Sequence, residues 1–118
     1  MGLWIKKLAL ADGEEVQLEL LANHSLGKRA VGGKLVITSM RIVFLPNRLD
    51  AATGGQRLEI TRDQVESVGV QTKDMAISEA FSGAWRDRLA IYGKSDPFGF
   101  FVVNNAQKAV DELKGILG

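Results

Sequence analysis

The segment from residue 33 to residue 44 constrains the fold of this 118-residue chain more than any other. Apolar side chains recur there at every second position on either side of a short connection, at Leu35, Ile37, Ile42 and Phe44. Period-two alternation rich in β-branched and aromatic residues is typical of half-buried β-strands. Because little more than Ser39 and Met40 separates the two runs, we predict an antiparallel hairpin with a tight turn.

The remainder of the chain continues this β pattern and closes with a helix. Shorter alternating runs bring the number of strand candidates to seven, and these runs lie near residues 16–21, 58–60, 65–70, 89–91 and 98–102. The last run is followed by apolar residues at helical spacing, which are Ala106, Ala109, Val110, Leu113, Ile116 and Leu117. That spacing predicts a helix over residues 104–117, with Asn104 as its N-cap and Gln107 completing an approximate capping box.

Two stretches leave alternatives open. In the second strand, Gly32 and Gly33 indicate either a bulge or a bend. Residues 72–85 fit a short helix capped by Asp74, but Gly83 weakens that interpretation, and a loop or a strand is the alternative.

Length and charge bound the functions that the chain can have. Its length fits one domain, residues 1–118, with an apolar N-terminal segment over residues 1–12. The 15 basic and 14 acidic residues nearly cancel, so no overall field favours nucleic acid, and no nucleic-acid partner is expected. The absence of Cys excludes disulfides and thiolate metal sites. No apolar run reaches the roughly 18 residues of a membrane span and no signal-peptide order is present, so we expect a cytoplasmic protein.

No catalytic or cofactor motif occurs in the sequence. Residues 27–34 resemble a phosphate-binding loop superficially, but the Gly-to-Lys spacing is one residue too long, and Leu35 replaces the Ser or Thr that binds magnesium. His24 is the single His, and one His without Cys partners does not build the usual zinc site. We interpret His24 as a loop or strand-edge residue, and we predict neither an enzyme nor a bound cofactor.

The pattern Gly-x-Leu-x-Ile-Thr-x-x-Arg-Ile-x-Phe over residues 33–44 resembles the central hairpin of GRAM domains, relatives of the pleckstrin-homology fold. Ile60, Val65 and Val68 resemble the strand-turn-strand that follows in those domains. The resemblance covers roughly residues 14–117. It implies a mainly β (α+β) fold, either a seven-stranded pleckstrin-homology-like barrel or a curled sandwich, capped by the C-terminal helix of residues 104–117. It also implies a binding module that acts in membrane-associated processes through lipid or protein binding.

Basic residues beside two predicted inter-strand loops form one candidate site. Phosphoinositide-binding relatives of the pleckstrin-homology class place cations there, where they meet phosphate oxygens together with backbone amides. The corresponding residues of this chain are Lys28, Arg29, Lys34 and Arg48. The spaced Lys-x-Arg pattern of those relatives is missing, because Ala30 and Val31 separate the charges. The alternatives are therefore an anionic lipid headgroup site, which would make the protein peripheral to membranes, and a solvated turn.

Apolar side chains form the second candidate site. Its residues are Trp4, Val36, Val43, Leu45, Phe81 and Trp85. The valines and Leu45 lie on the outer face of the predicted hairpin and need a cover, which the N-terminal segment or a second copy of the chain can supply. The two aromatic residues of the 72–85 stretch mark a partner contact if they are exposed, whereas buried core is the default. The alternative function is accordingly a homo-oligomeric protein-interaction module with no lipid ligand.

Overall fold

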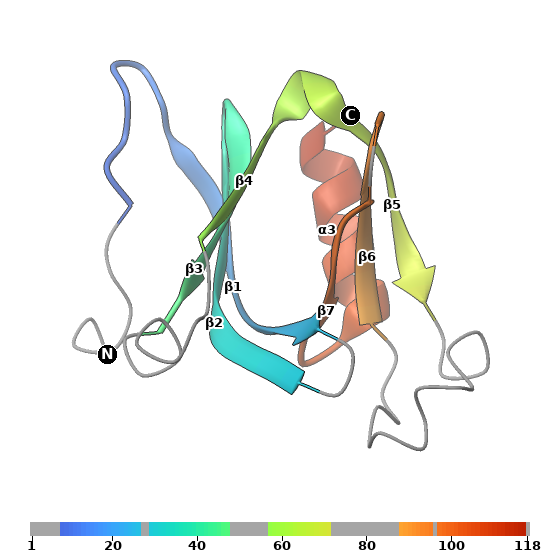
Figure 1. The fold of residues 1–118 in the computed structure, drawn as a ribbon. Helices are drawn as coiled ribbons and strands as arrows, with labels where there is room; N and C mark the ends of the chain where they lie inside the picture. The colour runs from blue at the N-terminus through green and yellow to red at the C-terminus, as the bar shows by residue number, and fades with distance from the viewer. Residues whose placement is uncertain (1–7, 27–28, 48–56, 72–87, 96, 118) are drawn as a thin grey trace.

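A computed structural model of the chain contains one curved β-sheet and a C-terminal helix (Figure 1). The structure describes residues 8–26, 29–47, 57–71, 88–95 and 97–117. Within these residues the elements in chain order are β1 (Val16–Leu26), β2 (Arg29–Thr38), β3 (Arg41–Pro46), β4 (Leu58–Thr61), the 3₁₀ turn η1 (Arg62–Gln64), β5 (Val65–Gln71), β6 (Arg88–Gly93), β7 (Pro97–Val102) and α3 (Ala106–Leu117).

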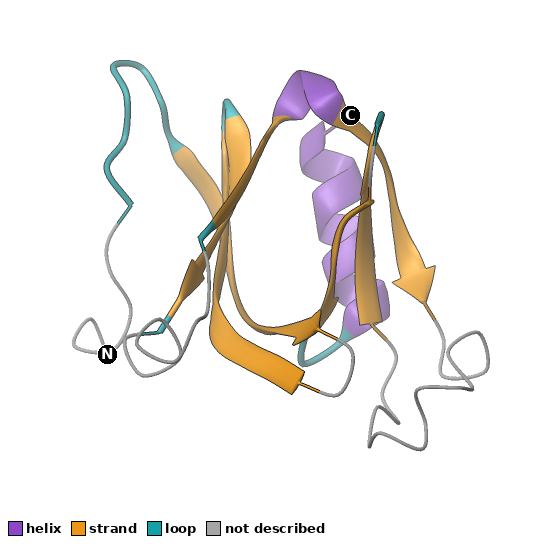
Figure 2. Ribbon diagram, in the orientation of Figure 1, coloured by secondary structure: helices purple, strands orange, loops and turns teal. Residues whose placement is uncertain are grey.

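The strands form a single antiparallel sheet of seven in the order β4-β3-β2-β1-β7-β6-β5. β4 and β5 end the sheet, which curls over on itself without closing (Figure 2). Its two halves are joined where the end of β1 pairs with β7, through Asn23 with Val102 and His24 with Phe101. The predicted order of seven strands followed by one helix is confirmed, and of the two predicted forms the open, curled one is present.

The β2–β3 hairpin follows the predicted alternation. Its inward-facing residues pair across the ladder and are inaccessible to solvent, Leu35 with Phe44 and Ile37 with Ile42. The Thr38 hydroxyl accepts hydrogen bonds from the N–H groups of Met40 and Arg41 at 3.1 and 3.0 Å. The Thr38 side chain therefore provides the acceptor for two backbone N–H groups of the tight turn.

Gly33 allows β3 to approach β2 closely. The β1–β2 ladder runs through Gly32 and Gly33 without a register shift, so of the two predicted alternatives, a bulge or a bend, the bulge is excluded. The ends of β1 and β2 that pair with each other bend together toward β7, in agreement with the predicted bend (Figure 1). A Cβ atom at Gly33 would lie 2.2 Å from the carbonyl oxygen of Leu45 and 2.8 Å from a ring carbon of Phe44. No larger residue fits there unless the backbone moves.

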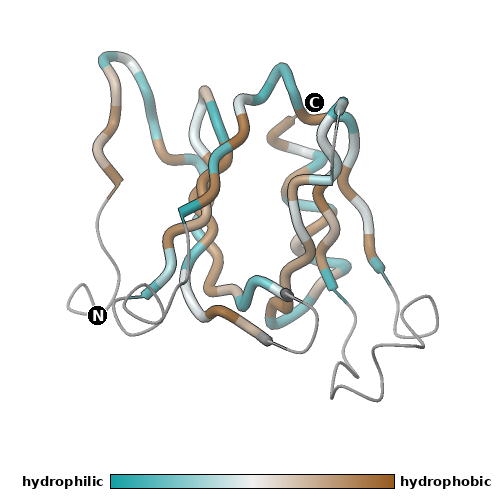
Figure 3. Tube along the Cα trace, in the orientation of Figure 1, coloured by the Kyte–Doolittle hydropathy of each residue, from teal (hydrophilic) through white to brown (hydrophobic). Residues whose placement is uncertain are grey.

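The hydrophobic core lies between the two halves of the sheet and α3. Hydrophobic residues recur along the strands and along the helix (Figure 3), and the buried ones form one core cluster. The buried residues of α3 are Ala106, Ala109, Val110 and Leu113, and Ile116 and Leu117 pack against the core more peripherally. The predicted apolar face of this helix is therefore confirmed, residue by residue.

The predicted N-cap of the helix is wrong by one residue. The side-chain oxygen of Asn105, not that of Asn104, accepts a hydrogen bond from the N–H of Lys108 at 3.1 Å. α3 begins one residue later than the capping pattern implied, so Gln107 stands too early to complete a capping box. Its side-chain amide instead donates to the Asp111 carboxylate one turn on, at 3.1 Å.

The outer face of the hairpin carries a second, smaller apolar cluster. Val36, Val43 and Leu45 are at most 4% exposed, and Leu8 packs against them. The segment that precedes β1 thus supplies part of their cover within a single chain. The predicted short helix at Asp74 lies outside the described residues.

Candidate functional site

Of the predicted basic site, Lys34 is the residue whose side chain the structure describes. Lys28 and Arg48 lie outside the described residues, and Arg29 is placed by its backbone as the first residue of β2. Lys34 pairs in register with Leu21 and Leu45, well inside the sheet rather than at a loop. Its ammonium group lies 2.8 Å from the Glu19 carboxylate. Lys34 therefore forms an ion pair between β2 and β1 on the outer face of the sheet.

The predicted apolar contact site is described in part. Trp4, Phe81 and Trp85 lie outside the described residues. Val36, Val43 and Leu45 are buried within the chain, as shown above, so a partner could reach these side chains only after their cover moved aside.

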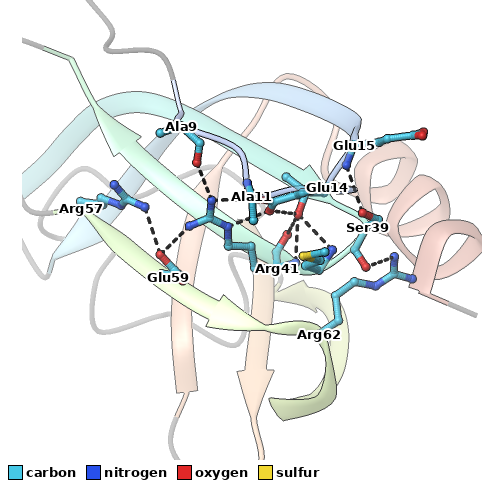
Figure 4. A network of polar contacts seen from close by, with 11 residues as sticks. Ala9, Ala11, Glu14, Glu15, Ser39, Arg41, Arg57, Glu59 and Arg62 are labelled. Atoms are coloured by element: carbon cyan, nitrogen blue, oxygen red, sulfur yellow. Dashed lines mark hydrogen bonds and ion pairs between the residues drawn. The ribbon is translucent and has the colours of Figure 1, made fainter.

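An ion-pair network fixes the segment that precedes β1 to the hairpin (Figure 4). The Arg41 guanidinium donates to both carboxylate oxygens of Glu14, from Nε at 2.7 Å and from Nη2 at 3.0 Å. It also donates to the carbonyl oxygen of Ala9 at 2.8 Å and to the Glu59 carboxylate on β4 at 3.0 Å. Bidentate, charge-assisted contacts of this kind fix position as well as charge. One arginine thus connects the N-terminal segment with β3 and β4.

Glu14 is held as a carboxylate. The hydrogen bonds from Arg41, then from the Thr38 hydroxyl and the Ala11 N–H, lower the pKa of Glu14 from 4.5 to about 2. Its side chain is inaccessible to solvent, whereas that of Arg41 is 15% exposed. A carboxylate with every oxygen bonded inside its own chain is not available as an acid, a base or a ligand. The network is therefore structural.

A cleft of about 500 Å³ lies between β5 and the C-terminal half of α3. Its walls come from η1, from the first half of β5 and from the helix, and the lining residues are Arg62, Val65, Glu66, Ser67, Val68, Lys114 and Leu117. Val65 and Leu117 also pack against the core, and they make part of the lining of the cleft apolar.

β5 offers a free sheet edge beside this cleft. It is the last strand of the sheet, and in the described part of the chain it pairs with β6 alone. Among these residues no backbone hydrogen bond joins β5 to α3. A register shift between Val65 and Ser67 marks a bulge, so the regular ladder runs over residues 67–71. On the unpaired side of that stretch, backbone N–H and C=O groups point outward at alternate residues, as on any edge strand.

Two cations stand near the end of α3 that borders the cleft. Arg62 donates to neutral oxygens, among them the carbonyl of Ile116 at 2.6 Å and that of Ser39 at 3.3 Å. The bond to Ile116 ties η1 to the last turn of the helix, where a positive charge is favourable. Lys114 is exposed and forms no ion pair within the described residues. Glu66, on the bulge, is the one carboxylate among the lining residues.

His24 is packed in an aromatic cluster, contrary to its interpretation as a loop or strand-edge residue. It lies inside β1, stacked on Phe101 with ring centroids 5.1 Å apart and tilted against Phe44 at 5.6 Å. Burial lowers the pKa of His24 below its usual 6.5, so the neutral ring is favoured. The residue therefore packs against the core where the two halves of the sheet join.

The described residues show neither a metal-binding cluster nor a membrane-spanning helix. They contain no group of three or more His, Cys, Asp or Glu side chains placed to hold a metal ion. Within the same residues, no helix has the length and hydropathy that a membrane-spanning helix requires.

No protein-family model matches the sequence, and no curated protein matches it significantly. Solved structures nevertheless share its architecture. The C-terminal domain of an unknown protein from Leishmania infantum is similar with a TM-score of 0.67 at 12% identity, over 90% of this chain and 86% of that one. The Vps36 N-terminal PH domain is similar with a TM-score of 0.53 at 20% identity, over 92% of this chain and 86% of that one. This chain has a pleckstrin-homology-like fold. Because such low identities show the fold alone, membership of the GRAM domains within the pleckstrin-homology-like fold stays a prediction.

The cleft between β5 and α3 was not predicted from the sequence. Val65, Val68 and Leu117 were predicted as apolar positions of a strand and a helix, but nothing local indicates that these two elements adjoin. The order of the elements predicts the fold, but it does not record this contact.

Proposed function

We propose that the chain is a non-enzymatic protein-interaction module, which adds an extended segment of another polypeptide to the free edge of β5. The observation that carries the proposal is the unpaired side of residues 67–71 beside the cleft that α3 borders. Addition of a strand to an exposed sheet edge is a recurrent mode of peptide recognition, in which backbone hydrogen bonds give affinity and neighbouring pockets give specificity. The fold supports a binding module in general, and the free edge favours a polypeptide ligand.

The lining of the cleft fits this function better than catalysis. Among the lining residues, Ser67 has no His or carboxylate bonded to its hydroxyl in the described part of the chain, so it lacks the base that activates a nucleophile. Val65 and Leu117 instead offer apolar surface for a side chain of the ligand. The other edge strand, β4, spans four residues, which leaves less ladder for a partner to extend.

The test is selection of a displayed library of random peptides against the folded chain, followed by affinity measurements on the enriched peptides. Ser67→Pro removes one N–H from the edge and should weaken binding at least tenfold if that N–H faces the ligand, whereas Ser67→Ala should bind like the parent. Circular dichroism shows whether the Pro variant folds. Should it not fold, chemical-shift mapping of the bound peptide on the parent protein decides the matter. Chemical-shift changes confined to residues outside β5 and α3 would refute the proposal. Failure of the selection to enrich any peptide would also refute it.

A second candidate function, peripheral binding of anionic lipid, rests on the strand directions. β1 and β3 run the same way, so the connections after Leu26 and after Pro46 leave the same end of the sheet, and these connections contain Lys28 and Arg48. Each cation near an anionic surface contributes about 1 kcal/mol, which predicts weak, salt-sensitive binding. Flotation with phosphatidylserine or phosphoinositide vesicles should then fall in a Lys28→Ala, Arg29→Ala double variant. Equal flotation of parent and variant would exclude this site.

A further inference from the structure

Resting on the proposed function, we propose that the segment recognised at β5 is acidic, with an apolar residue followed on its C-terminal side by Asp or Glu. The apolar side chain would lie against Val65 and Leu117, and the carboxylate would face Lys114 and Arg62. This assigns both a chemical class and a direction to the ligand.

The charge of the cleft carries the first part of the inference. Lys114 and Arg62 outnumber Glu66, so the cleft has a net positive charge. The two cations differ in how they are held. Arg62 is fixed by its bonds to the backbone of α3 and of the β2–β3 turn, whereas Lys114 has no ion-pair partner among the described residues. A ligand carboxylate would therefore gain a charge partner without breaking an ion pair that the structure shows.

The geometry of the edge carries the second part. η1 comes directly before β5, so Arg62 lies at the beginning of that strand, and its bond to Ile116 holds the end of α3 there too. Antiparallel pairing is the more stable arrangement and is the one found throughout this sheet. A strand added antiparallel to residues 67–71 ends near the beginning of β5. A carboxylate beyond its paired residues therefore reaches the two cations.

The bulge at the start of β5 separates the part of the site that pairs with the ligand backbone from the part that contacts the ligand carboxylate. The register shift between Val65 and Ser67 interrupts the ladder where the cations stand. Backbone pairing would thus be confined to residues 67–71, while the bulged stretch contacts the ligand through side chains. An acidic side chain and a free C-terminal carboxylate share this chemistry, and blocked peptide termini distinguish them.

The experiment compares the sequences of amide-blocked peptides enriched by the parent chain, by Lys114→Glu and by Lys108→Glu. Lys108 is a matched control, because it is also an exposed Lys of α3 but lines a different groove, beside β1. We expect the parent and Lys108→Glu to enrich peptides with Asp or Glu after an apolar residue, and Lys114→Glu to lose that preference. For one enriched peptide, the Glu-to-Gln exchange should weaken binding to the parent about two- to fivefold and to Lys114→Glu much less.

The outcomes separate the two proposals. Enriched peptides that map to β5 but show no acidic preference, or the same preference in Lys114→Glu, would overturn the acidic ligand and leave strand addition standing. If peptides bind only when their C-terminus is unblocked, the cations recognise a terminal carboxylate. That result would overturn the proposal of an acidic side chain. An absence of enriched peptides would overturn the proposed function, and the acidic ligand with it.

Discussion

Arg41 shows how one side chain can position a segment that has no regular structure. Residues 8–15 form neither helix nor strand, yet Ala9 and Glu14 both bond to the Arg41 guanidinium. The hydrogen bond from Ala11 to Glu14 closes the segment into a turn, and Gly13 there has a φ of 78°, which favours Gly. The residues that meet at this point are far apart in the sequence. Alternation could predict that Arg41 faces outward, but not which carboxylate it binds.

Replacement of Glu14 by Gln should lower the melting temperature near neutral pH and flatten its dependence on acid. The folded state lowers the pKa of Glu14 to about 2, from 4.5, so the ionised form stabilises the fold. That stabilisation is complete above about pH 4.5 and is lost as the pH falls toward 2. Melting curves of parent and variant should therefore differ most at neutral pH and converge in acid. Glu15→Gln, an exposed neighbour, is the control. A gap that stays constant over this range would contradict the assignment.

At the scale of elements, the helix and the hairpin were predictable because their signals are local. Each buried residue of α3, Leu113 for example, is one that helical spacing had marked, and the residues of β2 and β3 face the sides that alternation assigned. The predictions were wrong for the N-cap of α3 and for the role of Lys34, because each depends on a single residue or a single partner. Asn104 and Asn105 are equally suited as the N-cap, so the sequence does not indicate at which of them the helix begins. Lys34 was assigned to a loop site because its ion pair with Glu19 depends on the β1–β2 register.

Leu113→Ala should destabilise the fold by about 2–5 kcal/mol, because the side chain is inaccessible to solvent and its removal leaves a cavity between α3 and the sheet. Denaturant titration followed by circular dichroism measures the change. Glu112→Ala, at the adjacent exposed position of the same helix, should alter stability by less than about 0.5 kcal/mol. Equal effects of the two substitutions would mean that α3 does not cover the core.

Gly33→Ala tests the close approach of β3 to β2. The added Cβ would meet the Leu45 carbonyl oxygen at 2.2 Å, which no rotation of a side chain relieves. We expect a loss of about 1–3 kcal/mol, as for overpacking of a filled interior. Gly69→Ala is a matched control, because a Cβ there meets nothing within 4 Å. A Gly33→Ala variant as stable as the parent would show that the hairpin can shift to accommodate the methyl group.

At the scale of the whole molecule, the chain combines a covered face and an open edge. The outer face of the β2–β3 hairpin is covered in part by Leu8, whereas β5 pairs with β6 on one side and has no strand on its other side in the described part of the chain. The pleckstrin-homology-like fold was predictable from the order of its elements. The site was not, because the cleft depends on the contact between residues 62–68 and residues 114–117, and no local pattern records that contact.

Deletion of residues 1–10 should expose the outer apolar cluster, because it removes Leu8 and the Ala9 carbonyl that Arg41 binds. We expect stronger fluorescence of a hydrophobic dye and concentration-dependent association in sedimentation experiments. Leu8→Ser should give a weaker form of the same result. If the truncated protein keeps the solubility, stability and mass of the parent, Val36, Val43 and Leu45 need no such cover.

Hydrogen–deuterium exchange of backbone amides, with and without a library-selected peptide, tests strand addition to β5 most directly. Free edge amides exchange faster than amides paired in the sheet, so β5 residues 67–71 report the arrival of a new strand. We predict that the peptide slows exchange at alternate residues of this stretch and leaves β4 unchanged. Unchanged exchange along β5 when the peptide is saturating, or protection confined to the opposite end of the sheet, would contradict the proposed mode of binding.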